Sequence, residues 1–428
     1  MSASELRIRV LPAIGNVAAG AWDACANPVP TEVSLGRPAA AGLGSALPPV
    51  EARTGCPSDR SRSLAKSYIP FISHAFLYAL EASGSVGART GWLPRHLLAE
   101  TASGTPVGLV PCYLKSHSRG EYVFDQGWAE AYERAGGQYY PKVQVSVPFT
   151  PATGRRLLVR PGPDADRVRD TLVAGLVELC RVDEASSVHV TFATDEECRL
   201  LGEHGFLRRT DQQFHWQNAG YGSFDDFLSA LAARKRKAIR RERRDALAAG
   251  LEVQWLTGAD LTEAVWDAFF AFYMETGSRK WGRPYLTRKF YSLIGESMAD
   301  RILLVMARRG GRFIAGAINF IGSDTLYGRH WGAVEHHPFL HFEICYYQAI
   351  EFAIARRLPC VEAGAQGEHK LARGYLPVTT HSAHHIADPG LRRAIADYLC
   401  RERAYLEDAR RELAEAAPFR KDLSIDPA

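Results

Sequence analysis

A dense group of polar side chains stands near the end of the chain, in EAGAQGEHKLARGYLP at residues 362–377. The candidate residues in it are Gln366, Glu368, His369, Lys370, Arg373 and Tyr375. The acid and the histidine could move protons, the two cations could hold a phosphate or a carboxylate, and the tyrosine could donate to an oxyanion. Acyl transfer to an amine needs these tasks. The alternative is a solvated polar loop.

The segment HFEICYYQ adds His341 and Glu343 at the expected start of a helix. In a catalytic interpretation Glu343 is the base or orients the amine, and His341 makes a second polar contact with the substrate. In the alternative, Glu343 is a first-turn acid that complements the helix dipole, and His341 is a neighbour of the cap. The catalytic candidates are Glu343, Glu368, His369 and Lys370.

Two tryptophan-containing segments could form the wall of a substrate pocket. YGRHWG ends an expected strand and supplies Arg329 and His330, while RKWGRPYL supplies Trp281. Together these side chains could shape an aromatic-walled pocket. A tryptophan buried in a core is the alternative for either segment. The substrate-binding candidates so far are Trp281, Arg329, His330, His341, Gln366, Arg373 and Tyr375.

The run RKRKAIRRERR at residues 234–244 holds eight basic residues and one acid, a local charge of +7 in a chain of net charge +4. The rest of the chain is therefore slightly acidic (4 − 7 = −3). Such a helix could offer a phosphate-binding ridge to tRNA or to a nucleotide-linked acceptor. The alternative is a solvated charge run. The phosphate-binding candidates are Arg234, Lys235, Lys237, Arg241 and Arg244.

Composition excludes several classes of protein. The chain has 428 residues, of which 46% are hydrophobic and 23% charged, as in ordinary globular proteins. No apolar run approaches the roughly 18–20 residues of a membrane span, and a cytoplasmic location is expected. The eight cysteines form no C-x-x-C pair, which favours buried thiols. No histidine spacing indicates a metal site, so no metal is expected.

The elements that must position these candidates repeat along the chain. Strands, a helix and a strand occur twice, with TPVGLVPCYL corresponding to RFIAGAINFI, and this indicates a duplicated α/β unit. We expect domains at residues 1–221 and 222–390, followed by a C-terminal amphipathic helix and tail at 391–428 that pack on the second domain. Residues 27–66, rich in Pro, Gly, Ala and Ser, predict a disordered insertion.

Six segments together resemble the FemAB-like predicted N-acyltransferases. They are YYPKVQVSVPFTPATGRRLL (139–158), RKRKAIRRERR (234–244), RKWGRPYL (279–286), YGRHWG (327–332), HFEICYYQAIEFAI (341–354) and EAGAQGEHKLARGYLP (362–377). That family is related to the Gcn5-type acetyltransferase (GNAT) superfamily and to the peptidoglycan-bridge aminoacyl transferases. The resemblance covers nearly the whole chain except residues 27–66. It implies an α/β (α+β) fold of two tandem GNAT-like domains, each a mixed, mostly antiparallel sheet flanked by helices.

The resemblance also bears on single residues. Lys370 with Gly374 and Tyr375 matches a lysine before a Gly-aromatic close in the aminoacyl-transferring relatives, and Lys142 of YYPK matches a family motif. Lys142 is therefore a candidate anchor for an anionic substrate. The loops that would bind the pyrophosphate of acetyl-CoA are TPATGRRL and GRHWGAVEHHPFL. Neither fits the (Q/R)-x-x-G-x-(G/A) pattern of acetyl-CoA-binding members, in which backbone N–H groups hold the pyrophosphate.

The function implied is N-acyl or aminoacyl transfer to an amine acceptor, with the second domain active and a peptidoglycan precursor as the family-level acceptor. Two donors stay open. Aminoacyl-tRNA fits the basic helix and the degenerate loops, and acyl-CoA fits the superfamily and the compact second domain. The rival function is a non-catalytic binding protein of the same fold, which uses residues 234–244 to hold nucleic acid or an anionic precursor. The oligomeric state is left open.

Overall fold

The computed structural model describes residues 5–28, 67–248, 250–281, 284–364 and 367–420. The first unit runs from β1 to β9: β1 (Leu6–Leu11), α1 (Ala19–Ala26), α3 (His74–Ala82), β2 (Trp92–Pro94), β3 (His96–Thr101), β4 (Pro106–Val110), β5 (Cys112–Lys115), α4 (Gln126–Arg134), β6 (Lys142–Val145), β7 (Leu158–Val159), α5 (Ala165–Val182), β8 (Ser187–Ala193), α6 (Asp195–Glu203) and β9 (Leu207–Gln217). Residues 29–66 of the predicted insertion lie outside the described residues.

The second unit runs from α7 to β15 and is followed by one long helix. Its elements are α7 (Phe224–Ala230), α8 (Ala233–Leu247), β10 (Glu252–Leu256), α9 (Glu263–Trp281), α10 (Arg288–Met298), β11 (Ile302–Arg309), β12 (Arg312–Ile321), β13 (Thr325–Ala333), α11 (Leu340–Phe342), a π-helical turn η6 (Glu343–Tyr347), α12 (Gln348–Ala355), β14 (Cys360–Glu362), a 3-10 helix η7 (Glu368–Arg373), β15 (Leu376–Ile386) and α13 (Pro389–Glu415).

Hydrophobic periodicity explains the packing of the helices. In α5 the buried side chains recur at helical spacing and face the first sheet, as the sequence predicts; they are Val168, Leu172, Val173, Leu176 and Leu179. In the second unit α9 packs directly on β13. A Cβ atom at Gly332 would lie 2.0 Å from the carbonyl oxygen of Phe272, so only glycine permits this approach.

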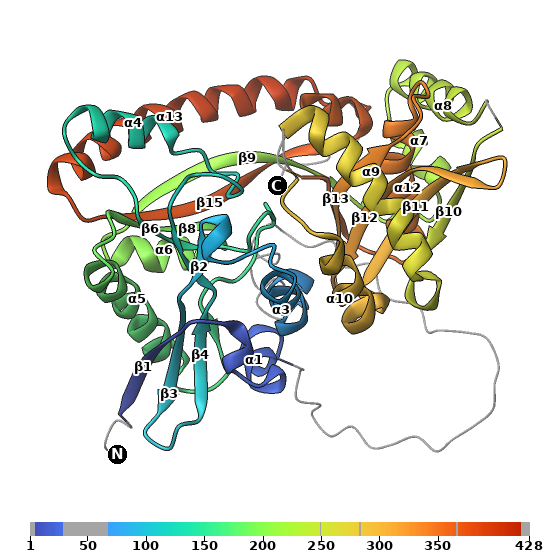
Figure 1. Ribbon diagram of the computed structural model, residues 1–428. Helices are drawn as coiled ribbons and strands as arrows, with labels where there is room; N and C mark the ends of the chain where they lie inside the picture. The colour runs from blue at the N-terminus through green and yellow to red at the C-terminus, as the bar shows by residue number, and fades with distance from the viewer. Residues whose placement is uncertain (1–4, 29–66, 249, 282–283, 365–366, 421–428) are drawn as a thin grey trace.

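The strands form a four-stranded sheet, β1-β3-β4-β7, and an eleven-stranded sheet, β10-β11-β12-β13-β14-β9-β15-β8-β6-β5-β2 (Figure 1). Among the described strand pairs, only β6–β8 and β13–β14 are parallel. A helix connects the strands of each parallel pair, α5 in the first unit and α12 in the second. The predicted fold class is confirmed: antiparallel-dominated sheets flanked by helices, built from a repeated unit.

The two units exchange their last strands. β9 ends the first unit but pairs with β14 and β15 of the second, and β15 pairs in turn with β8 of the first. The sequence does not predict this exchange. Because of the exchange, the ranges 1–221 and 222–390 share one continuous sheet, and β9 and β15 lie side by side across the middle of the molecule (Figure 1).

The C-terminal helix packs on both units. Its amphipathic stripe is present, and Leu391, Ile395 and Leu399 pack with Trp128 and Tyr139 of the first unit and with Ile386 of β15 in the second. The helix then runs along β9 and β15 (Figure 1). Beyond its end, a bridge between Leu231 and Phe419 returns the chain to the second unit. None of the described helices is long and apolar enough to cross a membrane.

Candidate functional site

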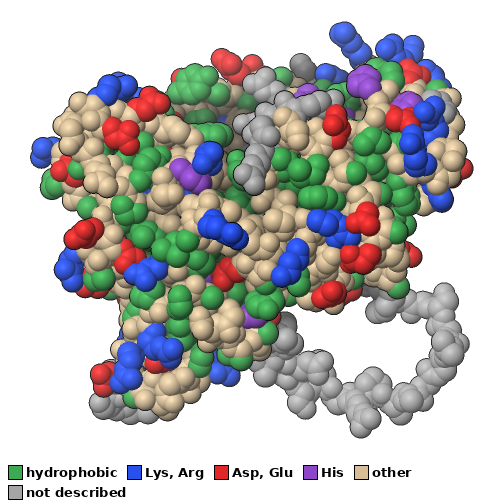
Figure 2. Space-filling model, in the orientation of Figure 1, with side chains coloured by type: hydrophobic (Ala, Val, Ile, Leu, Met, Phe, Trp, Pro, Cys, Tyr) green, Lys and Arg blue, Asp and Glu red, His purple; other side chains and the backbone are tan. Residues whose placement is uncertain are grey.

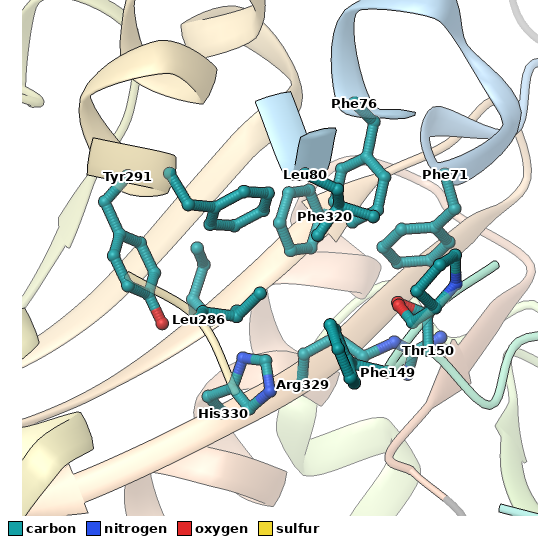
Figure 3. Close-up of a pocket in the computed structure, with 13 residues that line it drawn as sticks. Phe71, Phe76, Leu80, Phe149, Thr150, Leu286, Tyr291, Phe320, Arg329 and His330 are labelled. Atoms are coloured by element: carbon teal, nitrogen blue, oxygen red, sulfur yellow. The ribbon is translucent and has the colours of Figure 1, made fainter. Parts of the chain in front are cut away.

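The candidate site begins at an irregularity in β13. Where β12 pairs with β13, the single residue Ile318 lies opposite two residues, Arg329 and His330, because the register shifts. Neighbouring side chains on a regular strand point to opposite faces, whereas a β-bulge re-aims them. As a result, Arg329 and His330 both line the same pocket (Figure 3).

This pocket lies between the two units. Its free volume is about 10 Å³, roughly the space of one water molecule, and its walls are mostly apolar. The first unit contributes Phe71, Phe76, Leu80 and Phe149, and the second contributes Leu286, Phe290, Tyr291, Ile318 and Phe320. Apart from the hydroxyls of Thr150 and Tyr291, Arg329 and His330 supply the polar side chains of the wall. Most of these apolar side chains belong to the hydrophobic core that the two units share.

The Arg329 guanidinium is buried against the pocket, with its side chain 3% exposed. Its Nη1 donates to the Gly328 carbonyl at 2.7 Å, and its Nη2 lies 3.7 Å from Glu362 Oε2. Nε and Nη2 have no hydrogen-bond partner among the described residues. Burial lowers the pKa of Arg329, and Glu362 opposes that effect. Arg329 is thus a cation paired with Glu362, and its Nε and Nη2 groups can still donate hydrogen bonds to a ligand.

Next to Arg329, the parallel strands β13 and β14 stop pairing after Tyr327 and Glu362. Two residues beyond Glu362, the Gly364 carbonyl accepts from Lys370 Nζ at 2.9 Å. The side chain is buried, and burial together with the nearby Arg329 lowers the pKa of Lys370 to about 8. The structure therefore brings Lys370 and Arg329 together, although 41 positions separate them.

Two other predicted residues, His341 and His369, form a rim near Lys370. The exposed His369 shares a hydrogen bond of 2.9 Å with the Tyr346 hydroxyl. The ring of His341 lies 6.3 Å from that of His369 and 5.2 Å from that of Trp331, between centroids. The helix α11 and the turn η7 thus place three candidates close together.

Arg373 and Tyr375 are buried by neighbouring side chains rather than open to a substrate. Arg373 pairs with Glu242 of α8 at 2.9 Å and lies 3.4 Å over the ring of Phe342. Tyr375 is fully buried against Tyr346, and burial raises its pKa. Its hydroxyl has no hydrogen-bond partner among the described residues. In this structure Arg373 joins α8 to η7.

Glu343 has two partners of its own. Both its oxygens accept from Arg243 of α8, at 2.9–3.2 Å, and Oε1 also accepts from Gln348 at 2.7 Å. The carboxylate is fully buried, while Arg243 also pairs with Glu351 at 2.7 Å. Because its lone pairs are committed to Arg243 and Gln348, this geometry favours a carboxylate that positions η6 over one that accepts a proton from substrate.

We therefore expect Glu343→Gln to lower the free energy of unfolding by about 1.5–3 kcal/mol, because a neutral amide replaces the buried carboxylate that accepts from Arg243. The matched control is Glu351→Gln. Glu351 is the more exposed partner of the same arginine, and its loss should cost less than about 1 kcal/mol. Denaturant titration measures both. An unchanged midpoint for Glu343→Gln, with transfer abolished, would restore the catalytic interpretation.

The predicted basic helix is α8, and it has two different sides. Glu242 and Arg243 face the site and bind Arg373 and Glu343. The opposite side is exposed, and Lys and Arg side chains gather over α8 in Figure 2. Among the phosphate-binding candidates, Arg241 and Arg244 pair with Asp245. For Arg234, Lys235 and Lys237 no ion pair with a described residue occurs.

In the first unit, the loop that corresponds to a pyrophosphate loop is filled by the chain itself. The Glu197 carboxylate accepts from the backbone N–H groups of Arg156 and Leu157 at 2.8–3.0 Å. The buried Arg156 guanidinium donates to the carbonyls of Ala152, Gly154, Arg155 and Thr191. A carboxylate thus occupies the donors that would hold an anion, so this unit offers no free phosphate loop.

Lys142 lies in another closed network. Its Nζ donates to Ser118 at 2.8 Å, to Glu121 at 3.0 Å and to Asp125 at 2.5 Å, and the side chain is 1% exposed. Burial tends to lower the pKa of Lys142, but Glu121 and Asp125 outweigh it and the pKa is raised. The structure therefore commits this ammonium to internal carboxylates and does not present it to an anionic substrate.

Three candidates lie outside what can be described. Gln366 is among the residues that the structure leaves out, and the side chains of Glu368 and Trp281 are not described. Among the described residues, no group of three or more His, Cys, Asp or Glu side chains is arranged to hold a metal ion. Of the seven described cysteines, five are buried.

Several residues of this region are not singled out by sequence reasoning. Glu362 ends β14 beside Arg329, Phe149 lines the pocket, and Glu242 and Arg243 connect α8 to the site. Its position at the end of a buried strand could have indicated Glu362. For Arg243 the only available signal is its place within a run of eight basic residues, which does not distinguish it from its neighbours.

Two successive units, each with a helix joining parallel strands beside an antiparallel meander, define a tandem GNAT-type fold. Comparison with protein families matches residues 56–421 to the FemAB-like family, described as peptidoglycan biosynthesis/recognition. The chain belongs to the FemAB-like family. A comparison with curated protein sequences found no match.

Solved structures are similar at low identity. FemX is 12% identical, with a TM-score of 0.49, and the alignment covers 80% of this chain and 99% of FemX. A tandem GNAT protein from the clavulanic acid biosynthesis pathway is 14% identical with a TM-score of 0.44, covering 90% and 99%. L-PGS from Bacillus licheniformis is 9% identical with a TM-score of 0.47, covering 77% and 96%.

Proposed function

We propose that the chain is an N-acyltransferase that transfers an acyl or aminoacyl group to an amine of a cell-envelope precursor, with the second unit as the active one. The observation that carries the proposal is the bulge that turns Arg329 and His330 into one pocket beside Lys370. Membership in a family described as peptidoglycan biosynthesis/recognition supports the choice of acceptor. The cytoplasm is the proposed location, because such precursors carry nucleotides there.

The reaction places definite demands on the site. The amine lone pair attacks the acyl carbonyl carbon, the C–N bond forms, and the C–O bond of an ester or C–S bond of a thioester breaks. One proton leaves the nitrogen, and one proton reaches the departing oxygen or sulfur. Stabilising the oxyanion and moving these protons are the contributions that a protein site can make.

The described residues fit these demands as follows. The unused N–H groups of Arg329 donate to the carbonyl oxygen as negative charge develops. Lys370, whose pKa burial and Arg329 lower to about 8, exchanges a proton near neutral pH. Burial and Arg329 lower the pKa of His330 to about 4, so its imidazole is neutral and can accept a hydrogen bond from the amine. His341 and His369 form the rim, and Arg373 and Glu343 position the two turns.

A transfer assay tests this proposal. The purified chain is incubated with a nucleotide-linked muramyl peptide and, in separate reactions, with a mixed aminoacyl-tRNA pool or with a set of acyl-CoA thioesters. Mass spectrometry of the peptide reports the mass gained. One donor class should label the free amine. No mass gain with either donor class, on precursors that carry a free amine, would contradict the proposal.

The exposed cations of α8 favour a second candidate function, namely a binding protein for nucleic acid. If this function is correct, replacing Arg234 and Lys237 by Gln should reduce the slope of log binding constant for tRNA against log salt concentration by about 2, since each lost phosphate contact removes roughly one unit. The control is the pair Lys289→Gln and Arg393→Gln, exposed cations on α10 and α13. Equal slopes for both pairs would reject α8 as the phosphate contact.

A further inference from the structure

An open groove lies between β9 and α13, and it shares no lining residue with the pocket described above. α13 runs along β9 at this place (Figure 1). The groove has a free volume of about 500 Å³, within the usual range of ligand sites. Its α13 residues recur at spacings of three and four, so they share one face of the helix. The wall consists of Asp211 of β9 and of Tyr398, Arg401, Glu402, Tyr405 and Leu406 of α13.

Two tyrosines give the groove aromatic walls that solvent reaches. Tyr405 is 73% exposed and Tyr398 is 40% exposed. The Tyr398 hydroxyl donates to Glu402 Oε1 at 3.1 Å, and its ring centroid lies 6.2 Å from that of Trp128, so this ring is held in place. A tyrosine ring has an apolar face and a polar tip. Such rings can cover the C–H face of a sugar ring and leave its hydroxyl groups free to bond at the edge.

The charges of the groove are balanced. Glu402 accepts from Arg209 through both oxygens, at 2.7 and 2.8 Å. One carboxylate, Asp211, and one guanidinium, Arg401, have no ion pair with another described residue. Asp211 Oδ1 accepts from the Gln212 backbone N–H at 2.7 Å, and burial raises the pKa of Asp211. Further donors would therefore stabilise this carboxylate.

This balance distinguishes between classes of ligand. An anionic ligand would meet Asp211 and a cationic ligand would meet Arg401, and like charges at close range repel each other. A neutral ligand rich in hydroxyl and amide groups finds an acceptor in Asp211 and donors in Arg401, and it brings no charge of its own. A saccharide ring, with an apolar face and a hydroxyl edge, fits this pair and the two tyrosines.

The register of β9 relates the groove to the candidate site. Asp211 and His215 point to the same face of the strand, because residues two and four apart share a face. His215 pairs in register with Glu362, which lies beside Arg329. Four residues of a strand span about 13 Å, at about 3.3 Å each. An extended peptide of about four residues covers the same length, so one ligand can occupy the groove and present an amine at the site.

We propose that the groove between β9 and α13 binds a neutral saccharide ring of the acceptor, with Tyr398 and Tyr405 against the ring and Asp211 and Arg401 at its hydroxyl and acetamido groups. The inference rests on the proposed function, since it names the part of the acceptor that is held away from the reacting amine. A muramyl peptide, which joins a sugar to a short peptide, has the required form.

Binding of a free oligosaccharide tests the inference without any transfer step. The probe is the linear trimer of N-acetylglucosamine, and calorimetric titration of the full chain gives its affinity. Tyr405→Ala should weaken binding about fivefold or more, as truncation of an aromatic contact does. Asp211→Asn should also weaken it about fivefold, although asparagine keeps an oxygen for the Gln212 N–H. The controls Tyr78→Ala and Asp397→Asn, exposed on α3 and α13 outside the groove, should bind as the original chain does.

Three results would overturn the inference. The first is no binding of the trimer by the original chain, and the second is equal affinity for the original chain and both groove variants. The third concerns charged probes, spermidine and tripolyphosphate. If either binds more tightly than the trimer and loses that affinity in Asp211→Asn or Arg401→Gln, the groove is a site for a charged ligand.

The transfer assay distinguishes failure of this inference from failure of the proposed function. With a muramyl peptide as acceptor, Tyr405→Ala should raise KM about fivefold and leave kcat unchanged, because the contact is the same in the ground state and the transition state. Transfer with an unchanged KM removes this inference and keeps the enzyme. Trimer binding that the groove variants weaken, without transfer from any donor, removes the enzymatic function and keeps the saccharide site.

Discussion

Replacing Glu197 by alanine should lower the free energy of unfolding by about 3–5 kcal/mol. The carboxylate accepts from two buried backbone N–H groups, those of Arg156 and Leu157, and an unsatisfied buried donor costs about 1–3 kcal/mol. The same side chain closes the capping box of α6 with Thr194, which adds roughly 1 kcal/mol. Equilibrium denaturation followed by tryptophan fluorescence measures the loss.

The neighbouring residue provides the control for this change. Glu196 lies in the same first turn of α6 but is exposed, so Glu196→Ala should stay within about 0.5 kcal/mol of the original chain. If Glu197→Ala were equally mild, the first-unit loop would be held by Arg156 alone. An anion could then compete for its backbone N–H groups, and the conclusion that this unit offers no phosphate loop would fall.

The parts of the fold that depend on residues close together in the sequence were predictable. Helical spacing places Leu172 and Leu176 on the buried face of α5, and the repeated order of elements predicts the duplication. The exchange of β9 and β15 is different. It depends on pairing between strands that are more than a hundred residues apart in the sequence. The sequence of β9 is compatible with pairing to β8 as well as to β14, and the structure has β14.

The candidate site shows the same limit: the sequence predicts which residue types are present but not which partners they bind. Lys370 was a candidate because it belongs to a dense polar group, and Arg329 because it ends an expected strand. The structure brings the two together. Glu343 and Lys142 had equally suggestive positions, but their partners are 100 and 17–24 residues away. A sequence shows that a carboxylate starts a helix, whereas it does not show that an arginine has already engaged that carboxylate.

The bulge in β13 explains why one pocket holds two consecutive side chains. By alternation, Arg329 and His330 would face opposite sides of the sheet. The extra residue opposite Ile318 cannot be read from YGRHWG, since glycine and β-formers give no unique position for it. The sequence therefore predicted the residues of the pocket wall but not the geometry that aims them at one ligand.

Replacing Lys370 by methionine should reduce transfer by at least 100-fold while making the chain more stable near pH 7. The loss of transfer follows from removing the group that exchanges protons, a contribution of about 10²–10⁴ in rate. The gain in stability follows because burial lowers the pKa of Lys370 from 10.5 to about 8, so folding disfavours its charged form. That shift corresponds to about 3 kcal/mol, less about 1 kcal/mol for the lost hydrogen bond to Gly364.

The pH dependence of stability tests the predicted sign of this stability change. Because the folded-state pKa of Lys370 lies below the unfolded value, the unfolded chain binds more protons between about pH 8 and 10.5, and the stability of the original chain rises with pH across that window. Lys370→Met should lack this rise, so its advantage is complete below about pH 8 and gone above 10.5. Lys289→Met, at an exposed lysine of α10, should change neither stability nor rate. If Lys370→Met keeps its transfer rate within threefold, Lys370 does not transfer the proton. If Lys370→Met is less stable than the original chain at pH 7, burial does not disfavour the charged form of Lys370.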